Sequence, residues 1–142
     1  FVLAQGLGAI CGVALAHAMF GQDLLQTGTT ERTGVGQWIG EATATFGLIL
    51  TIFGTAASRP AAMPAAVALY IVAAYWFTSS TSFANPAVTM ARALTDTFSG
   101  IRPKDAPMFV LAQCGGAALG AVAAQFLFAS RSSIDRGDEG TA

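Results

Sequence analysis

Residues 78–100 read TSSTSFANPAVTMARALTDTFSG, and this stretch decides which fold the chain can adopt. Asn85 suits the N-cap of a helix, Pro86 suits the first helical position because its missing N–H costs nothing there, and Gly100 suits the C-terminal cap. The pattern predicts a helix that is too short to cross a bilayer. The polar Ser/Thr run before it cannot expose its backbone to lipid, so it should line protein or a watery cavity.

A half-helix that begins at membrane depth points its free N–H groups and its positive dipole end into that cavity. Cations are then repelled there. If the side-chain oxygen of Asn85 caps the helix, its NH2 group remains free to donate to a water or hydroxyl oxygen. The alternative is an ordinary capped surface loop in which Asn85-Pro86 makes a turn.

The composition of the chain predicts lipid as its solvent. Of 142 residues, 54% are hydrophobic and 11% are charged, whereas an ordinary soluble domain has roughly a quarter charged residues. A net charge of −1 gives no reason to expect a nucleic-acid partner. Cys11 and Cys114 lie in apolar runs without CxxC spacing, so we expect buried free thiols. No catalytic residue, metal site or cofactor is predicted.

Four stretches are long and apolar enough to span a membrane: residues 1–21, 37–57, 62–81 and 107–130. Pro60 and Pro64 lie in the short linker between the second and third of these, so those two spans form an antiparallel pair. The basic residues are distributed on both sides and do not orient the chain. We expect an all-α membrane domain over residues 1–130 and a polar, disordered cytoplasmic tail over residues 131–142. The apolar start without a charged leader predicts a piece of a longer protein.

The chain contains an internal repeat. Residues 1–5 and 109–113 both read FVLAQ, and ten of twenty positions are identical between residues 1–20 and 109–128. Three spans separate the two starts, so the second copy is inverted relative to the first. Each copy carries a Gly-xxx-Gly spacing that allows close helix packing. The alternative is convergence of two Ala/Gly-rich helices.

These features together resemble the aquaporin and glycerol-facilitator family, the major intrinsic proteins. The resemblance rests on Asn85-Pro86-Ala87, on the inverted repeat, and on Glu41 with Thr45 at the family's Glu-xxx-Thr spacing. It implies six spans and two half-helices that meet at paired Asn-Pro-Ala motifs. Only one motif is present, so the chain resembles the third to sixth spans, and alone it should not seal a pore. The missing Asn should lie about 24 residues upstream of Phe1, as Asn85 precedes Phe109.

The resemblance also implies a role for Glu41, since an ionisable group in a span normally has a partner. Glu41, with Thr45 beside it, should accept hydrogen bonds from backbone near the Asn85 loop. The carbonyls of that loop, among them those of Phe83 and Ala84, would then face the pore. The alternative is a proton-coupled carboxylate in a transporter.

The residues at the family's filter positions depart from its usual pattern. Val88 stands where family members usually have Arg, and Ala73 stands where water-selective members typically have His. Ser82 occupies another filter-facing position. These uncharged residues imply a wide constriction without strict water selectivity. Arg92, one turn beyond Val88, could supply a vestibule charge, but pairing with Asp96 is the simpler expectation. His17 is expected to pack or to lie at the interface.

The function implied is a passive channel for small neutral solutes such as glycerol-like polyols, undissociated metalloid hydroxides and water. It would work without catalysis, as a homotetramer surrounded by lipid, in the bacterial inner membrane. Two alternatives stay open. One is a proton- or ion-coupled secondary transporter, which also uses inverted repeats and broken helices. The other is a non-conducting membrane scaffold.

Overall fold

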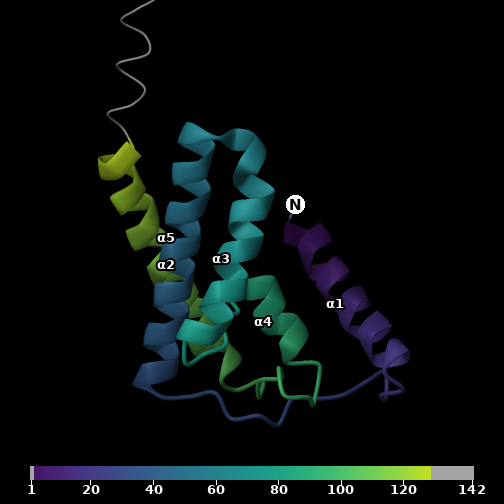
Figure 1. The fold of residues 1–142 in the computed structure, drawn as a ribbon. Helices are drawn as coiled ribbons and strands as arrows, with labels where there is room; N and C mark the ends of the chain where they lie inside the picture. Colours follow the sequence, from purple (N-terminus) through teal and green to yellow (C-terminus); the bar gives the residue numbers. More distant parts are fainter. Residues whose placement is uncertain (1, 129–142) are drawn as a thin grey trace, which may run out of the picture.

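The computed structural model describes residues 2–128, and all regular structure in that range is helical (Figure 1). Four helices are long and apolar enough to cross a membrane, as the sequence predicts. The predicted polar tail, residues 131–142, lies outside the described residues. The elements in chain order are α1 (Val2–Met19), α2 (Val35–Ser58), the 3-10 helix η1 (Pro60–Ala62), α3 (Met63–Phe77), α4 (Pro86–Arg92) and α5 (Ala106–Phe128).

The closest helix pair is α2 and α5, and glycines of α5 make it possible. A Cβ atom added to Gly116 would collide with the main-chain oxygen of Ala42, and one added to Gly120 would lie 2.9 Å from the main-chain oxygen of Phe46. Only glycine leaves room for the backbones to approach this closely. The Gly-xxx-Gly spacing of the second repeat copy is therefore a packing surface.

Helices α2 and α3 form the antiparallel pair that the proline-containing linker predicts (Figure 1). Pro60 and Pro64 lie in the first turns of η1 and α3, where a missing N–H breaks no helical bond. The hydroxyl of Tyr70 on α3 donates to the main-chain oxygen of Ala44 on α2, at 2.9 Å. This bond fixes the two helices at mid-length.

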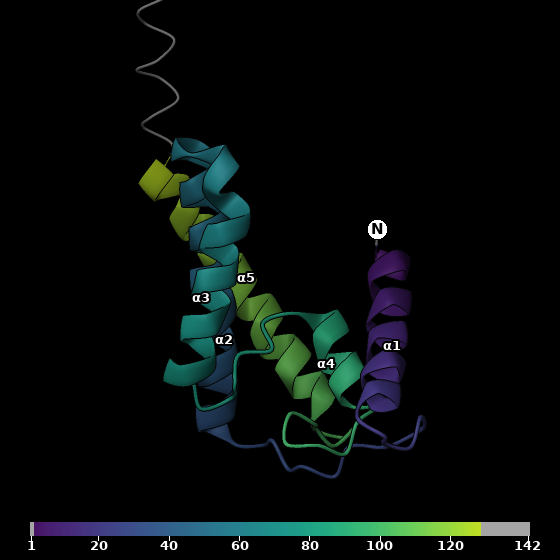
Figure 2. The same cartoon turned by 45° about the vertical axis from the view of Figure 1, so that its right-hand side comes forward.

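Helix α1 lies apart from the other spans and runs in the direction opposite to α5, as both ribbon views show (Figures 1 and 2). Opposite directions are what an inverted repeat requires of its two copies. Among the described helices α1 packs mainly on α4, and its one buried residue is His17. Gly8 and Gly12, the counterparts of Gly116 and Gly120, have no neighbour within 4 Å.

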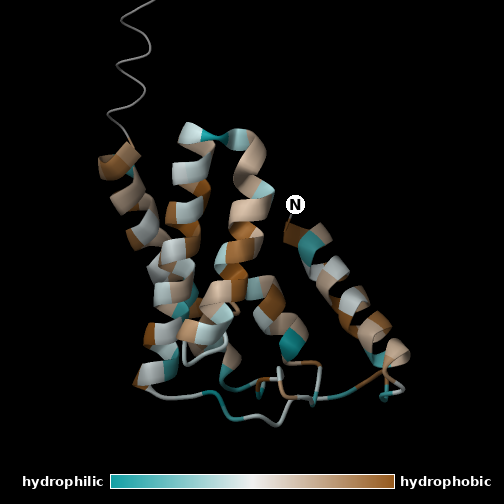
Figure 3. Cartoon of the chain, in the orientation of Figure 1, coloured by the Kyte–Doolittle hydropathy of each residue, from teal (hydrophilic) through white to brown (hydrophobic). Residues whose placement is uncertain are grey.

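In the view of Figure 3 the spans are mostly neutral to hydrophobic, and hydrophilic residues lie in the α2–α3 turn and in the connecting loops. The chain is therefore an integral membrane protein that crosses the bilayer several times. One expectation is wrong, because Cys11 and Cys114 are exposed. Both belong to helix faces that are uncovered by other described residues, so apolar surroundings in the sequence did not mean burial within the bundle.

Candidate pore loop and half-helix

Helix α4 begins as its sequence predicts. Asn85 is the N-cap, with an extended backbone, and its side-chain oxygen accepts a hydrogen bond from the N–H of Ala87 at 2.8 Å. Pro86 occupies the first turn. Because Oδ1 of Asn85 is engaged in this way, its Nδ2 is the atom that can donate to a solute.

The end of α4 differs from the expectation. Gly100 does not cap this helix, which ends at Arg92 after seven residues. The chain beyond it folds back, so that the N–H of Ile101 donates to the oxygen of Arg92 and the N–H of Gly28 donates to the oxygen of Ala93. These loop donors satisfy carbonyls at the helix end and replace another helical turn. Gly100 instead permits a tight loop, since a Cβ there would collide with the oxygen of Thr95.

The loop before α4 is held by the carboxylate of Glu41, which is fully buried on α2. One oxygen accepts from the N–H of Phe83 at 2.8 Å and the other from the N–H of Ala84 at 2.9 Å. The hydroxyl of Thr45 donates to the main-chain oxygen of Glu41 at 2.9 Å, so its link to the loop passes through that residue. The two loop N–H groups thus point toward α2.

The same loop has an unusual backbone. Thr81, Ser82 and Ala84 have φ angles of 62°, 49° and 50°, in the left-handed region that side chains other than glycine rarely adopt. Each such residue costs roughly 1–2 kcal/mol. The conformation persists because surrounding bonds determine it, and those bonds include the two that Glu41 accepts from Phe83 and Ala84. Strain of this kind gathers at functional sites.

Gln113 is a member of the site that the sequence analysis missed. Its Nε2 donates to Glu41 at 2.7 Å and to the hydroxyl of Thr89 at 2.8 Å, and the side chain is 1% exposed. The hydroxyl of Thr89 also lies 3.1 Å from the main-chain oxygen of Asn85. Gln113 therefore joins α5, α2 and α4 in one network. Its place in the repeated FVLAQ pentapeptide was the signal that could have identified it.

Arg32, in the loop after α1, is a second residue that was missed. Its guanidinium donates to the main-chain oxygens of Ser80, Phe98 and Gly100 at distances of 3.2, 2.9 and 2.8 Å. The charge is buried, no carboxylate side chain among residues 2–128 is bonded to it, and burial lowers the pKa of Arg32 below its ordinary value. The sequence around Arg32 gives no signal of this role, because the three carbonyls lie 48 to 68 residues away.

The three filter candidates occupy different surroundings. Val88 is half-buried and lines a cavity of about 600 Å³ between α1 and α4, and it packs against the core around Phe83. Ser82 is buried, and its hydroxyl has no partner among the described residues. Ala73 is exposed on α3. Neither Ala73 nor Ser82 lines the cavity that contains Val88.

Arg92 does not pair with Asp96, contrary to the expectation. Asp96 turns away and accepts bonds from the N–H and hydroxyl of Thr29, at 3.1 and 2.6 Å. Arg92 lies over the ring of Phe83, with 4.2 Å from Cζ to the ring centroid, and lines the same cavity as Val88. The helix ends before Asp96, so the one-turn spacing that would bring the two charges together does not exist.

Apolar spans, two of them in an inverted relation, and a capped half-helix on a strained loop define a membrane protein of the channel and transporter type. A family model described as "Major intrinsic protein" matches residues 60–140, and the chain belongs to this family. The chain is also 55% identical, over 117 residues, to Aquaglyceroporin AqpS of Rhizobium meliloti (strain 1021). That match covers 82% of this chain and 50% of the relative, so the chain spans about half the length of the curated relative it matches. No solved structure matches the chain.

Proposed function

We propose that the whole protein is a passive channel for small neutral solutes, such as glycerol-like polyols, undissociated metalloid hydroxides and water. The observation that carries this proposal is the clamp on the pore loop, in which Glu41 and Gln113 hold the backbone before Asn85. Both oxygens of Glu41 accept loop N–H groups at 2.8 and 2.9 Å. The relative's name, an aquaglyceroporin, supports the same class of solute.

The pore loop conducts by exchanging hydrogen bonds with the solute. Nδ2 of Asn85 donates to a solute oxygen, since its Oδ1 is occupied by the N–H of Ala87. Carbonyls of the loop, including those of Phe83 and Ala84, accept from solute hydroxyls in this proposal. The carbonyl of Phe83 is supported directly, because the N–H of Ala84 in the same planar peptide is turned to Glu41 on the opposite side. A neutral solute then crosses without losing all its hydrogen bonds at once.

Selectivity in this proposal depends on a filter made by Ala73, Ser82 and Val88. All three are small or medium-sized and uncharged, so the constriction is wide enough for polyols. Val88 carries most of the difference, because an Arg at this position would narrow the passage. The half-helix dipole of α4 remains as a barrier to cations.

The filter is tested by Val88→Arg in the whole protein reconstituted in liposomes. Glycerol permeability should fall at least tenfold, whereas water permeability should fall about twofold or less, because a narrower opening excludes the larger molecule first. Val88→Leu, which adds bulk without charge, is the matched control and should give an intermediate effect. Equal glycerol permeability in Val88→Arg and in the unchanged protein would exclude Val88 as the constriction.

A second experiment separates a channel from the two alternative classes. Flux through a channel should rise linearly with glycerol concentration and ignore imposed proton and sodium gradients. Flux that saturates and follows one of these gradients would instead identify a coupled transporter. Liposomes that remain as tight as empty ones to every solute would identify a scaffold.

The assembly proposed with this function is a homotetramer in the bacterial inner membrane, with each protomer enclosing its own pore. The exposed apolar faces of the spans leave ample surface for lipid and for neighbouring protomers. Native mass spectrometry from lipid nanodiscs should give the mass of four chains.

A further inference from the structure

The proposed filter has no charge of its own. Val88 is uncharged, and the dipole of α4, a helix of seven residues, amounts to about half a positive charge at its N-terminus. Half a charge is a weaker barrier to cations than the full charge of an arginine. A pore of this kind that rejects cations therefore needs a further positive charge close to Val88.

Arg32 brings such a charge to the core beside Val88. Its guanidinium carbon lies 5.2 Å from the ring centroid of Phe83, and Val88 packs against the core cluster that contains this ring. Arg32 belongs to the loop between α1 and α2. Its charge therefore reaches the filter region from a part of the chain far from α4 in sequence.

All three nitrogens of this guanidinium are held by main-chain oxygens of the chain itself. Nε donates to Gly100 at 2.8 Å, Nη1 to Ser80 at 3.2 Å and Nη2 to Phe98 at 2.9 Å. Ser80 precedes α4 and the other two residues follow it. Arg32 is only 6% exposed, so the described residues alone enclose it and fix its position.

The acids closest to Arg32 leave its guanidinium charge in place. Asp105 accepts from the main-chain N–H of Arg32 at 3.0 Å, but its contact with a charged side chain is to Arg102, at 2.9 Å. Glu31 is likewise paired with Arg102, at 2.7 Å. Carbonyl oxygens are neutral dipoles, and a buried charge is screened much less than an exposed one. The field of Arg32 therefore extends to its surroundings.

The charges around the ring of Phe83 have a positive sum. Arg92 lies 4.2 Å from the same ring centroid as Arg32. Glu41 contributes one negative charge, through its bond with the N–H of Phe83. Two positive charges and one negative charge leave a net positive charge beside the pore loop, and without Arg32 that sum would be zero.

We propose that Arg32 is a specificity-determining residue, whose charge excludes cations from the pore in place of an arginine at position 88. Arg32 does not touch the solute and acts through its electric field. This role rests on the proposed function. The alternative is that Arg32 only holds the loops together. Lysine separates the two roles, because it keeps the charge but lacks the planar fork that bonds three carbonyls at once.

Sodium and glycerol permeability are measured in parallel on the whole protein in liposomes, with the membrane potential fixed by potassium and valinomycin. Arg32→Gln should raise sodium permeability at least tenfold, because it removes a poorly screened charge. Arg32→Lys should stay as tight to sodium as the unchanged protein. Lys104→Gln, which removes a positive charge at an exposed position of the same loop face, should have no effect. Equal sodium leaks in Arg32→Lys and Arg32→Gln would reduce Arg32 to a structural clamp and overturn the proposal.

A second variant keeps the test valid if Arg32→Gln does not fold. Arg32→His carries a charge that can be removed by pH in the folded protein. Its sodium permeability should rise as pH increases through the range in which histidine loses its proton, ordinarily near pH 6.5. His17 is present in this variant and in the unchanged protein, so any effect of His17 appears in both. The same pH dependence in the two proteins would overturn the proposal.

Glycerol permeability separates failure of this role from failure of the channel. Arg32→Gln that passes glycerol and remains tight to sodium would refute the role of Arg32 and leave the channel intact. An unchanged protein that passes no glycerol would refute the channel, and the role of Arg32 with it.

Discussion

Glu41 is a buried carboxylate. Its oxygens accept hydrogen bonds from three described residues, namely from the main-chain N–H groups of Phe83 and Ala84 and from the side-chain amide of Gln113. None of them can receive a proton, so Glu41 acts only as an acceptor. This pattern gives no support to a proton-coupled role and fits a residue that shapes the loop. Replacing one of its two oxygens by a donor would leave a buried loop N–H without an acceptor, which costs about 1–3 kcal/mol.

Glu41→Gln is therefore expected to disturb the pore loop with little change in side-chain volume. The new amide NH2 faces a loop N–H, donor against donor, so solute permeability should fall at least tenfold and the melting temperature should decrease. Stopped-flow light scattering and thermal unfolding in detergent measure the two effects. Asp23→Asn makes the corresponding carboxylate-to-amide change at an exposed residue, and it should alter neither. Unchanged permeability in Glu41→Gln would mean that the clamp does not shape the pore.

Asp105 lies just before α5, and its pKa predicts how the stability of the protein changes in acid. Burial alone would raise the pKa of Asp105, but hydrogen bonds from Arg102 and from the N–H of Arg32, with the charges of Arg102 and Lys104, hold it below its ordinary value. Its stabilisation is present above the pKa of the unfolded chain, about 3.9, and is lost as pH falls through the lower pKa of the folded state.

The melting temperature should accordingly fall as pH decreases below about 4. Asp105→Asn should lower the melting temperature near neutral pH and reduce its further fall in acid. Asp23→Asn, at an exposed aspartate, is the control. The same acid dependence in Asp105→Asn and in the unchanged protein would assign the acid effect to another group.

At the residue level, the sequence predicted the start of α4 better than the contacts that hold the loop before it. Asn85 as N-cap and Pro86 in the first turn follow from local rules, and the structure has both. Gln113 and Arg32 did not follow, because their partners are distant in sequence. The repeated pentapeptide marks Gln113 but does not say what it contacts, and no pattern marks Arg32. The predicted Arg92–Asp96 pair was wrong for a related reason. The prediction assumed that the helix continues to Asp96, whereas contacts from the loops end it at Arg92.

The contact between α2 and α5 is the most extensive one between the described helices, and its glycines allow a matched comparison. Gly116→Ala should lower the melting temperature, because its Cβ would collide with the oxygen of Ala42 and push the helices apart. Gly115→Ala makes the same change one residue earlier, where nothing lies within 4 Å, and should be neutral or slightly stabilising. Thermal unfolding in detergent measures both. Equal melting temperatures for the two variants would show that this contact is not limiting.

At the level of elements, hydropathy and proline positions predicted the four spans to within a few residues, because these depend on local composition. The short helix was predicted to begin correctly but to end too late. Its end depends on Ile101 and Gly28, whose N–H groups meet the last carbonyls from other parts of the chain. Helix propensity depends on residues that are close in sequence, so it could not predict these contacts.

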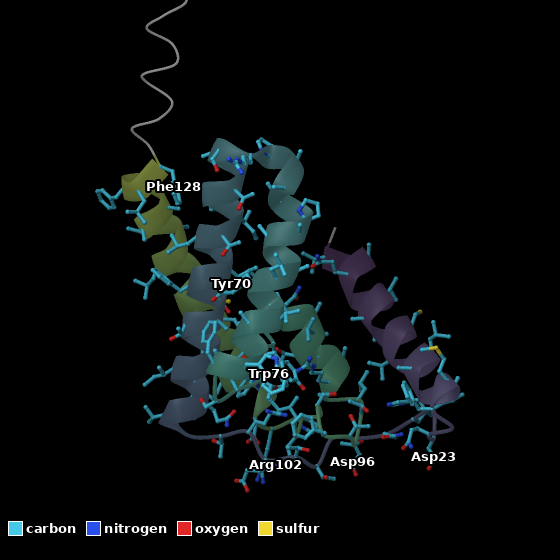
Figure 4. All side chains as sticks on the ribbon, in the orientation of Figure 1. Asp23, Tyr70, Trp76, Asp96, Arg102 and Phe128 are labelled. Carbon is cyan, nitrogen blue, oxygen red and sulfur yellow. The ribbon has the colours of Figure 1, made fainter. Side chains whose placement is uncertain are left out.

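At the level of the whole molecule, the long loops lie at one end of the spans and the α2–α3 turn lies at the other (Figure 1). Asp23, Asp96 and Arg102 lie along one edge, and Phe128 lies at the opposite end (Figure 4). The turn at Arg59 joins α2 to α3 at the end where α2 finishes, away from the long loops (Figure 1). The membrane must therefore separate Arg59 from the loop residues.

Cysteine labelling of the intact membrane tests this topology. In a background without Cys11 and Cys114, Asp23→Cys and Lys104→Cys should both react with a membrane-impermeant maleimide from one side. Arg59→Cys should react only from the other side, since an odd number of spans separates it from each of them. Reaction of all three positions from the same side would contradict the arrangement of spans.

The position of Gln113 in the chain also sets the order in which the site can be completed during synthesis. Glu41 and Thr89 leave the ribosome 72 and 24 residues ahead of Gln113, the donor that joins them. Until α5 enters the membrane, the carboxylate of Glu41 is one donor short, and α4 lacks its connection to α2. The network that joins the loop, α2 and α4 is thus complete only after α5 has entered the membrane.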